Sequence, residues 1–590
     1  MLGQTHGDPW YLLMFFFLAY NTGRITSFSS LCRFQVFIYF ICAFQNMSCG
    51  IHYMGSMILV VAPEHACKPP GNVSKFVVHN TSVAKLEDVW ALMSPDHKEH
   101  ITAELQNGEV WDLSRCGRVR RDSPLHAANS GSEPHFPCSD GYVYDQRQWK
   151  STVVTKWNLI CDQKLFAKLI QPIFMFGVLL GAIIFGYFSD KKGRQVVLWF
   201  TSTGIFLFGI LSTFTFDYYI FMIARFFLAM VTSGYLVVGF VYVTEFVGRK
   251  SRTWTSMNMN SFFVFGLIVV AFTGYFVKTW WLYQVILSSV TFPFILYCWV
   301  LPESPFWLIS EGRYKEAQQL IDVMAHWNGT SRCDLCEVLS LDLSAPVGSK
   351  SAATKKPNIL DLFYSWKVTS GTLTIWLVWF TVSFGFYSLS MKPIHSGDSV
   401  YINLFLVAVL EIPGYIFTSV LINKVGRRIG QAFCLFCIAL FCTIIIAIPQ
   451  RYYFGVIAAT IFARFFIGST FGLVYLYTAE LYPTVVRSLA MGTSNMVCRV
   501  GSILAPVALY LSSTWIFMPQ LSLGILSFLG GVFSMTLPET NRKPLATTWE
   551  EMALLESEHQ STSSKAVPTA NEPGVENTEV VKLEDSGLGE

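Results

Sequence analysis

Charged side chains are scarce in this chain, since Asp, Glu, Lys and Arg make up only 14% of its 590 residues. A soluble globular domain carries nearer a quarter. Here 52% of the residues are hydrophobic, 16% are aromatic and the mean hydropathy is +0.44. The net charge of only +3 is spread over the loops and forms no basic surface for a nucleic acid. The composition therefore excludes a nucleic-acid partner and predicts a polytopic membrane protein.

Motifs for enzyme chemistry are also missing from the sequence. The GRKS sequence ending at Ser251 lacks the spacing of a phosphate-binding loop. Cys333 and Cys336 form an isolated CxxC without two further zinc ligands nearby, so we expect free thiols there. No nucleophile, metal cluster or acid–base pair stands out elsewhere. We expect a protein that is not an enzyme and that has no cofactor and no metal site.

Apolar stretches of roughly 20 residues give about twelve candidate membrane spans. In chain order they are 34–62, 166–189, 195–216, 218–243, 258–277, 280–301, 371–391, 401–423, 430–449, 452–478, 488–511 and 514–537. They fall into two sets of six, within residues 34–301 and 371–537. The fold expected from this pattern is an all-α membrane protein built of two six-helix bundles.

The segments outside the spans differ in character. Residues 1–33 hold an apolar patch too short to cross a membrane, and we expect a cytoplasmic extension there. Residues 302–370 form a polar loop between the bundles, with helical stretches, and residues 538–590 a largely disordered cytoplasmic tail rich in Ser, Thr and Glu.

Basic residues in the short loops give the orientation. They gather on one side of the predicted bundle, at Lys191, Lys192, Arg194, Arg249, Lys250, Arg252, Lys424, Arg427, Arg428 and Arg487. Short cytoplasmic loops carry such an excess of Lys and Arg, so we expect both termini in the cytoplasm.

The long loop 63–165 then lies outside the cell. It holds four cysteines and two glycosylation sequons: Cys67, Cys116, Cys138, Cys161, Asn72 and Asn80. An even set of cysteines in an oxidising compartment predicts a disulfide-bonded, glycosylated ectodomain. Spacing does not determine the pairing, and Cys49 could join it.

The two halves share several short motifs. Gly193-Arg194 corresponds to Gly426-Arg427, and ARFF begins near Arg225 and again near Arg464. A Glu precedes an Arg by seven positions in both EFVGRKSR (Glu245 to Arg252) and ELYPTVVR (Glu480 to Arg487). PESPFWL (302–308) follows the sixth span and PET (538–540) follows the twelfth. These repeats indicate two halves in parallel duplication.

Together, in this order, these motifs resemble the major facilitator superfamily. The large cysteine-bearing outer loop, LEIPGY around Glu411, TAELYPTVVR and the terminal GLGE resemble solute carrier family 22, in its organic cation and carnitine transporter branch. The resemblance runs from about residue 34 to the C-terminus. It implies a twelve-helix plasma-membrane transporter of small molecules such as carnitine and organic cations, surrounded by membrane lipid, and a role in male germ cells. Whether a coupling ion (sodium or a proton) takes part stays open.

By this resemblance, one set of charged residues forms a cytoplasmic gate. Asp190, Arg194, Glu245 and Arg252 would connect the helix ends of the first half. Glu303, Arg427, Glu480 and Arg487 would be available to the second half. The alternative is that these charges only fix topology and helix packing.

Charges within spans carry more information, because an ionisable group in hydrocarbon normally faces a cavity or a partner. Arg464, Glu411 and Arg499 are such residues, and Arg499 should lie near the membrane midplane, where facilitators bind substrate. The resemblance adds that polyspecific cation members have an Asp at this position and carnitine-type and anion members an Arg. An Arg binds a carboxylate through two parallel hydrogen bonds. Arg499 could instead pair with Glu411 or hold a chloride ion, and Glu411 could instead contact an ammonium group.

A quaternary ammonium has no N–H donor, and its usual site in proteins is an aromatic cage. Aromatic residues recur at helical spacing in three spans, and those singled out as substrate contacts are Trp379, Phe386, Phe471, Tyr475 and Tyr235. A zwitterion with a trimethylammonium and a carboxylate would fit between this cage and Arg499. Two further readings stay open: a polyspecific cation uniporter in which Arg499 is structural, and a non-transporting receptor or scaffold on the same fold.

Overall fold

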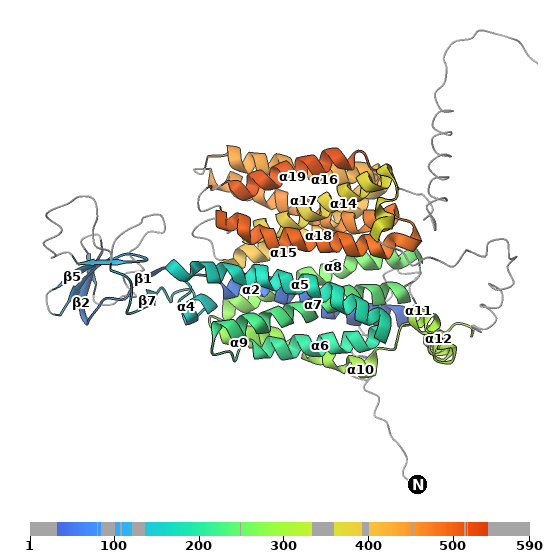
Figure 1. Cartoon of the computed structure of the whole chain (residues 1–590), viewed down its shortest axis with the longest axis horizontal. Helices are drawn as coiled ribbons and strands as arrows, with labels where there is room; N and C mark the ends of the chain where they lie inside the picture. Colours follow the sequence, from blue (N-terminus) through green and yellow to red (C-terminus); the bar gives the residue numbers. More distant parts are fainter. Residues whose placement is uncertain are drawn as a thin grey trace, which may run out of the picture.

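Two helical bundles lie side by side in the computed structural model, with a small β-rich domain at one end (Figure 1). This domain is formed by the loop predicted to be an ectodomain, and that name is kept for it below. The structure describes residues 32–78, 81–83, 101–106, 109–120, 136–247, 249–332, 359–391, 400–449, 452–511, 515 and 517–540. Cys333 and Cys336 lie outside these residues, as do most of the terminal segments.

The first bundle contains the helices α2 (Arg33–Leu59), α5 (Lys164–Lys192), α6 (Arg194–Leu211), α7 (Tyr218–Phe246), α8 (Arg249–Phe276) and α9 (Trp280–Ser289). The span predicted over 280–301 is interrupted after α9, and continues as the 3-10 helix η5 (Phe292–Leu296) and the short α10 (Tyr297–Val300). Pro293 removes a backbone donor at this break, which favours the interruption.

The second bundle contains α14 (Trp366–Met391), α15 (Val400–Val425), α16 (Arg427–Ala447), α17 (Tyr453–Leu481), α18 (Thr484–Leu511) and α19 (Met518–Ser534). Between the bundles, α11 (Pro305–Ser310) and α12 (Tyr314–Asn328) follow the first, and the 3-10 helix η6 (Ile359–Phe363) precedes the second.

Among the described residues, 10 helices are long and apolar enough to cross a membrane. The predicted spans 280–301 and 514–537 correspond to two shorter apolar helices, Trp280–Leu296 and Met518–Ser534. The prediction of a helical membrane protein is therefore confirmed.

Small residues allow the helices to approach closely. A Cβ on Gly181 of α5 would lie 2.2 Å from the carbonyl oxygen of Met230 in α7. In the second bundle, a Cβ on Gly501 of α18 would lie 2.6 Å from the carbonyl oxygen of Phe380 in α14. Glycine is thus required at both crossings, as is common where membrane helices pack through their backbones.

The ectodomain contains two antiparallel sheets. One pairs β1 (His65–Cys67) with β7 (Tyr142–Tyr144). The other has the order β3-β2-β4-β5-β6, with β2 at Val73–Val78, β3 at Thr81–Val83, β4 at Ile101–Leu105, β5 at Val110–Leu113 and β6 at Arg118–Arg120. The short helix α4 (Val153–Trp157) and the 3-10 helix η4 (Cys161–Gln163) lead from the ectodomain into α5. Lys156 donates from Nζ to the carbonyl oxygen of Thr215 at 2.6 Å, so this segment contacts the loop before α7.

Candidate functional site

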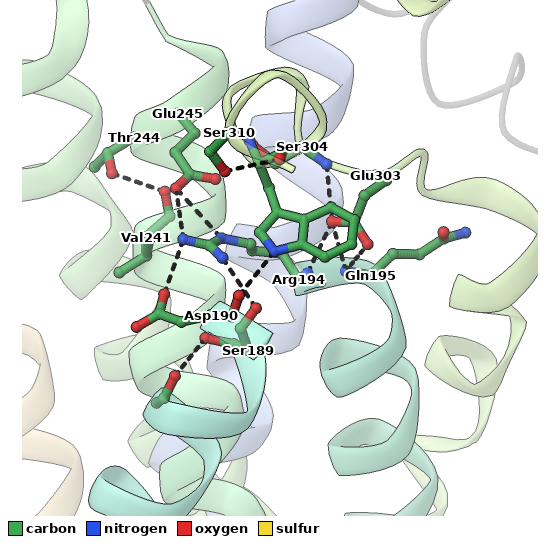
Figure 2. A network of polar contacts seen from close by, with 12 residues as sticks. Ser189, Asp190, Arg194, Gln195, Val241, Thr244, Glu245, Glu303, Ser304 and Ser310 are labelled. Atoms are coloured by element: carbon green, nitrogen blue, oxygen red, sulfur yellow. Dashed lines mark hydrogen bonds and ion pairs between the residues drawn. The ribbon is translucent and has the colours of Figure 1, made fainter. Parts of the chain in front are cut away.

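At the end of the first bundle far from the ectodomain, Arg194 is the centre of a polar cluster (Figure 2). Its Nη2 lies 3.0 Å from a carboxylate oxygen of Asp190 and 3.3 Å from one of Glu245. Its Nη1 donates to the carbonyl oxygen of Ser189 at 2.9 Å. The side chains of Arg194 and Glu245 are only 12% and 17% exposed. The structure thus brings together three of the predicted gate residues, with Asp190 of α5 and Glu245 of α7 around the guanidinium of Arg194 at the start of α6.

Glu303 caps the first turn of α6, and this corrects its predicted assignment to the second half. Its carboxylate accepts from the backbone N–H of Arg194 at 2.8 Å and from that of Gln195 at 3.2 Å. A carboxylate is stabilised at a helix N-terminus because the first backbone N–H groups lack intrahelical partners. Burial raises the pKa of Glu303, and these hydrogen bonds act in the opposite direction. The residue therefore ties the segment after α10 to the start of α6 within the first half.

The second half repeats the cluster. Arg427 at the start of α16 donates from Nε and Nη2 to the two carboxylate oxygens of Glu480, at 3.1 and 3.2 Å. The carboxylate of Glu539 accepts from the backbone N–H of Arg427 at 2.8 Å and from that of Arg428 at 3.0 Å. Glu539 is the counterpart of Glu303, and the sequence reasoning missed it. The shared PES and PET motifs were the signal that could have identified it.

Arg252 and Arg487 are the remaining two predicted gate residues. Arg252 lies in α8, but its side chain is outside the described residues. Arg487 donates from Nε to the carbonyl oxygen of Tyr482 at 3.3 Å, whereas Glu480 pairs with Arg427. Among the described residues, the ion pairs of Arg194 with Asp190 and Glu245, and of Arg427 with Glu480, each join residues of the same half.

Arg499 lies midway along α18 and is 4% exposed. Its guanidinium carbon is 5.5 Å from the ring centroid of Tyr53, which comes from α2 of the first half. Its other electrostatic neighbours include Tyr387 of α14 and Tyr475 of α17. Nε of Arg499 has no hydrogen-bond partner in the described part of the chain. Arg499 thus meets aromatic residues from both halves.

Four of the predicted aromatic residues lie together, and one of them, Tyr475, is the neighbour of Arg499. Trp379 is fully buried, and its ring centroid lies 4.3 Å from that of Tyr475 and 6.2 Å from that of Phe471. The ring centroid of Phe386 lies 6.1 Å from that of Phe471. The indole N–H of Trp379 donates to the hydroxyl of Thr478 at 3.0 Å, which fixes the ring. Phe386, Phe471 and Tyr475 are only half-buried.

Two other predicted substrate contacts lie elsewhere. Tyr235 is buried in a separate hydrophobic cluster of the first bundle, and its hydroxyl donates to the carbonyl oxygen of Cys42 at 2.8 Å. Glu411 of α15 is 3% exposed and interacts electrostatically with Arg464 of α17. Glu411 is therefore related to Arg464 by electrostatics and not by an ion pair among the described residues, whereas the neighbours of Arg499 include aromatic residues.

At the ectodomain end, lysine–aromatic contacts join the two halves, and the sequence reasoning did not predict them. Nζ of Lys278, after α8, lies 4.5 Å from the ring centroid of Tyr401 in α15 and 5.1 Å from that of Tyr275. Trp149 of the ectodomain stacks on Tyr401 with centroids 5.1 Å apart. Nζ of Lys168 in α5 lies 4.1 Å from the ring centroid of Tyr510 in α18. The described halves are therefore in contact at this end.

The ectodomain cysteines form two pairs, Cys67 with Cys138 and Cys116 with Cys161. Cys49 is a buried free cysteine, and its thiol donates to the carbonyl oxygen of Thr232. Asn72 is exposed just before β2, and Asn80 lies outside the described residues.

The sequence matches known transporters over most of its length. Residues 135–551 match the family described as Sugar (and other) transporter. The human protein named solute carrier family 22 member 16 is 59% identical over 95% of this chain and 97% of its own length. The Bos taurus protein of the same name is 54% identical over 94% of this chain and 97% of its own length. The chain belongs to solute carrier family 22.

A more distant relative supports the same transporter branch, and solved structures show the same fold. The human organic cation/carnitine transporter 2 is 30% identical over 90% of this chain and 94% of its own length. Among solved structures, a double Trp mutant of XylE gives a TM-score of 0.53 at 17% identity, covering 67% of this chain and 90% of that one. The major facilitator proton:xylose symporter XylE with a bound sugar analogue gives 0.51 at 18% identity, covering 68% and 92%. These structures show the fold alone. The chain is thus a multi-pass solute carrier of the organic cation and carnitine transporter kind, with small molecules such as organic cations as its substrate class, and it is not an enzyme.

Proposed function

We propose that this chain carries carnitine, and related organic cations and zwitterions, across the plasma membrane by alternating access. The observation that supports this most is the position of Arg499, a buried guanidinium midway along its helix and beside an aromatic cluster. An Arg at this depth is costly unless it faces a partner or a cavity. A substrate carboxylate supplies that partner, because it can accept two parallel hydrogen bonds from the guanidinium.

The aromatic cluster supports binding of the opposite end of the same molecule. Tyr475 is the link, since it is an electrostatic neighbour of Arg499 and its ring packs edge-to-face on Trp379. Trp is the best cation–π partner among the aromatic residues. Phe386 and Phe471 extend the cluster and keep partly exposed faces. A trimethylammonium on these rings, with a carboxylate on Arg499, accounts for both features in one ligand.

Glu411 has a different place in this proposal. Its electrostatic partner is Arg464, so it balances a buried charge within the second half and leaves Arg499 available to substrate. If Glu411 contacts the ammonium group of a bound substrate, its carboxylate must interact with that group and with Arg464 at the same time.

Alternating access is supported by the unequal contacts at the two ends. Lysine–aromatic contacts bridge the halves at the ectodomain end. The ion pairs of Arg194 and Arg427 at the other end stay within one half each. Transport then requires the Lys278 and Lys168 contacts to break while the half-to-half contacts at the opposite end form. In this proposal both termini lie in the cytoplasm, and the ectodomain, with glycans on Asn72 and Asn80, faces outward.

Uptake of labelled carnitine and of labelled tetraethylammonium tests the proposal in cells expressing the wild type, Arg499→Ala or Arg499→Asp at matched surface levels. We expect the wild type to take up carnitine. The Arg499→Ala variant should lose carnitine uptake by at least about tenfold, because a charged hydrogen bond contributes roughly 1.5–3 kcal/mol. It should retain any tetraethylammonium flux, which needs no carboxylate anchor.

Two outcomes would contradict the proposal. Wild-type uptake of tetraethylammonium alone would favour a polyspecific cation uniporter in which Arg499 is structural. The absence of uptake of either compound by surface-expressed wild type would favour a receptor or scaffold.

A further inference from the structure

Arg225 is a second buried arginine, enclosed within the first bundle. It lies in α7, about 10 Å from the ectodomain end of that helix by the rise per residue. Its side chain is only 1% exposed. None of its three guanidinium nitrogens has a hydrogen-bond partner in the described part of the chain. The ring of Phe174 in α5 lies against it, with the ring centroid 4.9 Å from the guanidinium carbon.

The first bundle supplies no acid to balance this charge. Between residues 33 and 300, the membrane helices carry carboxylates only at their ends, at Asp190, Asp217 and Glu245. Asp190 and Glu245 contact Arg194 at the far end of the bundle. Asp217 caps α7 by accepting from the backbone N–H of Tyr218. An arginine does not lose its proton in a protein, so Arg225 remains charged.

The corresponding arginine of the second half shows what is missing. Arg464 belongs to the same ARFF motif, is also buried, and likewise has no hydrogen-bond partner for its guanidinium nitrogens in the described part of the chain. It differs from Arg225 in that an acid, Glu411 of α15, acts on it electrostatically. In the first half, Arg225 instead interacts electrostatically with Tyr283 of α9 and His52 of α2. A cation without a counter-charge inside a bundle costs several kcal/mol. The counter-charge must therefore come from outside the chain.

The surroundings of Arg225 fit a small anion. His52 is 1% exposed, and neither of its ring nitrogens has a hydrogen-bond partner among the described residues. One of these nitrogens carries a proton in a neutral imidazole, so His52 can donate to an anion beside Arg225. Gln171 lies in α5 about one helical turn before Phe174, on the side of the ectodomain. Its side-chain nitrogen also lacks a hydrogen-bond partner among the described residues, while its side-chain oxygen accepts from the hydroxyl of Ser56.

We infer that Arg225 and His52 bind a small monovalent inorganic anion, such as chloride, within the first bundle. The burial of both side chains, each 1% exposed, favours a monatomic ion over a larger organic acid. This site is distinct from the proposed substrate site, because two rings separate the arginines. Phe174 lies against Arg225, Tyr53 packs edge-to-face on Phe174 with centroids 5.7 Å apart, and Arg499 lies on Tyr53. The anion would therefore be separated from the proposed substrate site by the rings of Phe174 and Tyr53.

Thermal unfolding of the purified full-length protein in detergent tests the inference without any transport measurement. Sodium chloride is compared with sodium gluconate at equal ionic strength, so that general screening is the same. A ligand that binds only the folded protein raises its stability, so we expect chloride to raise the unfolding midpoint by about 2 °C or more. Substitution of Arg225→Gln should abolish this chloride-dependent rise, and His52→Ala should reduce it.

Two matched variants locate the anion. Arg464→Gln removes the corresponding arginine of the second half, and Arg499→Gln removes the arginine of the proposed substrate site. Both should keep the chloride-dependent rise. Loss of the rise in Arg499→Gln, with retention in Arg225→Gln, would place the anion at the substrate site and overturn the inference. The same holds if chloride and gluconate give equal midpoints in the wild type.

A variant that keeps the charge covers the case in which Arg225→Gln does not fold. Arg225→Lys retains a cation but loses the forked donor geometry. A higher chloride concentration should then be needed for the same rise in midpoint. An unchanged chloride response in Arg225→Lys would contradict the inference, because it would show that the guanidinium makes no contact with the ion.

Discussion

Nζ of Lys278 lies 4.5 Å from the ring centroid of Tyr401, so a cation of the first half rests on an aromatic ring of the second. The same ammonium donates to the Tyr401 hydroxyl at 3.4 Å. Trp149 stacks on the same ring, and the backbone N–H of Lys150 donates to the carbonyl oxygen of Lys278 at 3.1 Å. The ectodomain is therefore part of the contact that joins the halves at this end.

Replacing Lys278 by Met removes the cation and keeps the length of the side chain. A partly exposed cation–π contact contributes about 0.5–1 kcal/mol. We expect the Lys278→Met variant to open at the ectodomain end up to about fivefold more often. The measurement is the rate at which an impermeant maleimide labels a cysteine introduced at Val60, at the end of α2. Lys278→Arg keeps a cation and should label at the wild-type rate; equal rates in Lys278→Met and wild type would show that the contact does not hold this end closed.

Neutralising Glu245 removes the acid that faces Arg194 from α7. Arg194 is mostly buried, so Glu245→Gln leaves its guanidinium with only the exposed Asp190 as an ion-pair partner. We expect lower turnover at unchanged surface expression, by several-fold, because the network biases an equilibrium between states of similar energy. Uptake kinetics at matched surface levels measure this change.

The matched control for Glu245 is Glu316. It pairs with Arg313 at 2.6 Å, but both side chains are about half exposed. Exposed pairs contribute roughly 0–1 kcal/mol, so Glu316→Gln should transport like the wild type. Normal transport by Glu245→Gln would show that the Arg194 cluster only fixes helix packing.

Much of the helical architecture could be predicted from the sequence, because long apolar runs indicate membrane helices and repeated motifs indicate duplicated halves. The predicted span 218–243 corresponds to α7 at Tyr218–Phe246. Other features depend on three-dimensional contacts that no local pattern records. Glu303 was assigned to the wrong half, because its role as a cap of α6 depends on how the segment after α10 folds back. No sequence pattern predicts the contact between Lys278 and Tyr401 either, since it joins residues of different halves.

Gly193 and Gly426 directly precede α6 and α16 and have positive φ angles of 100° and 97°. A side chain is strained in this conformation, and a Cβ at Gly193 would lie 2.3 Å from a carboxylate oxygen of Glu303. We expect Gly193→Ala to destabilise the protein by about 1–3 kcal/mol and to lower its yield. The measurement is the unfolding midpoint in detergent.

Gly492 in α18 provides the control for this substitution. A Cβ there meets nothing within 4 Å, and its backbone is helical. Alanine is favoured over glycine in a helix, so Gly492→Ala should be neutral or slightly stabilising. Equal midpoints for Gly193→Ala and Gly492→Ala would contradict the proposed requirement for glycine at the start of α6.

His65 makes the stability of the ectodomain depend on pH. Its ring packs against Tyr142 and Tyr144 of the paired strand β7, and burial lowers its pKa below the usual 6.5. The unfolded chain therefore binds a proton at a higher pH than the folded one does. The stabilisation is fully present above pH 6.5 and is lost as the pH falls toward the lower pKa of the folded state. We expect the unfolding midpoint to fall between pH 7.5 and pH 5.5, and to fall less in His65→Gln, which cannot titrate. His326, in α12 outside the ectodomain, is the matched control, and His326→Gln should keep the wild-type slope. An identical pH dependence in His65→Gln and the wild type would show that this imidazole does not determine the acid sensitivity.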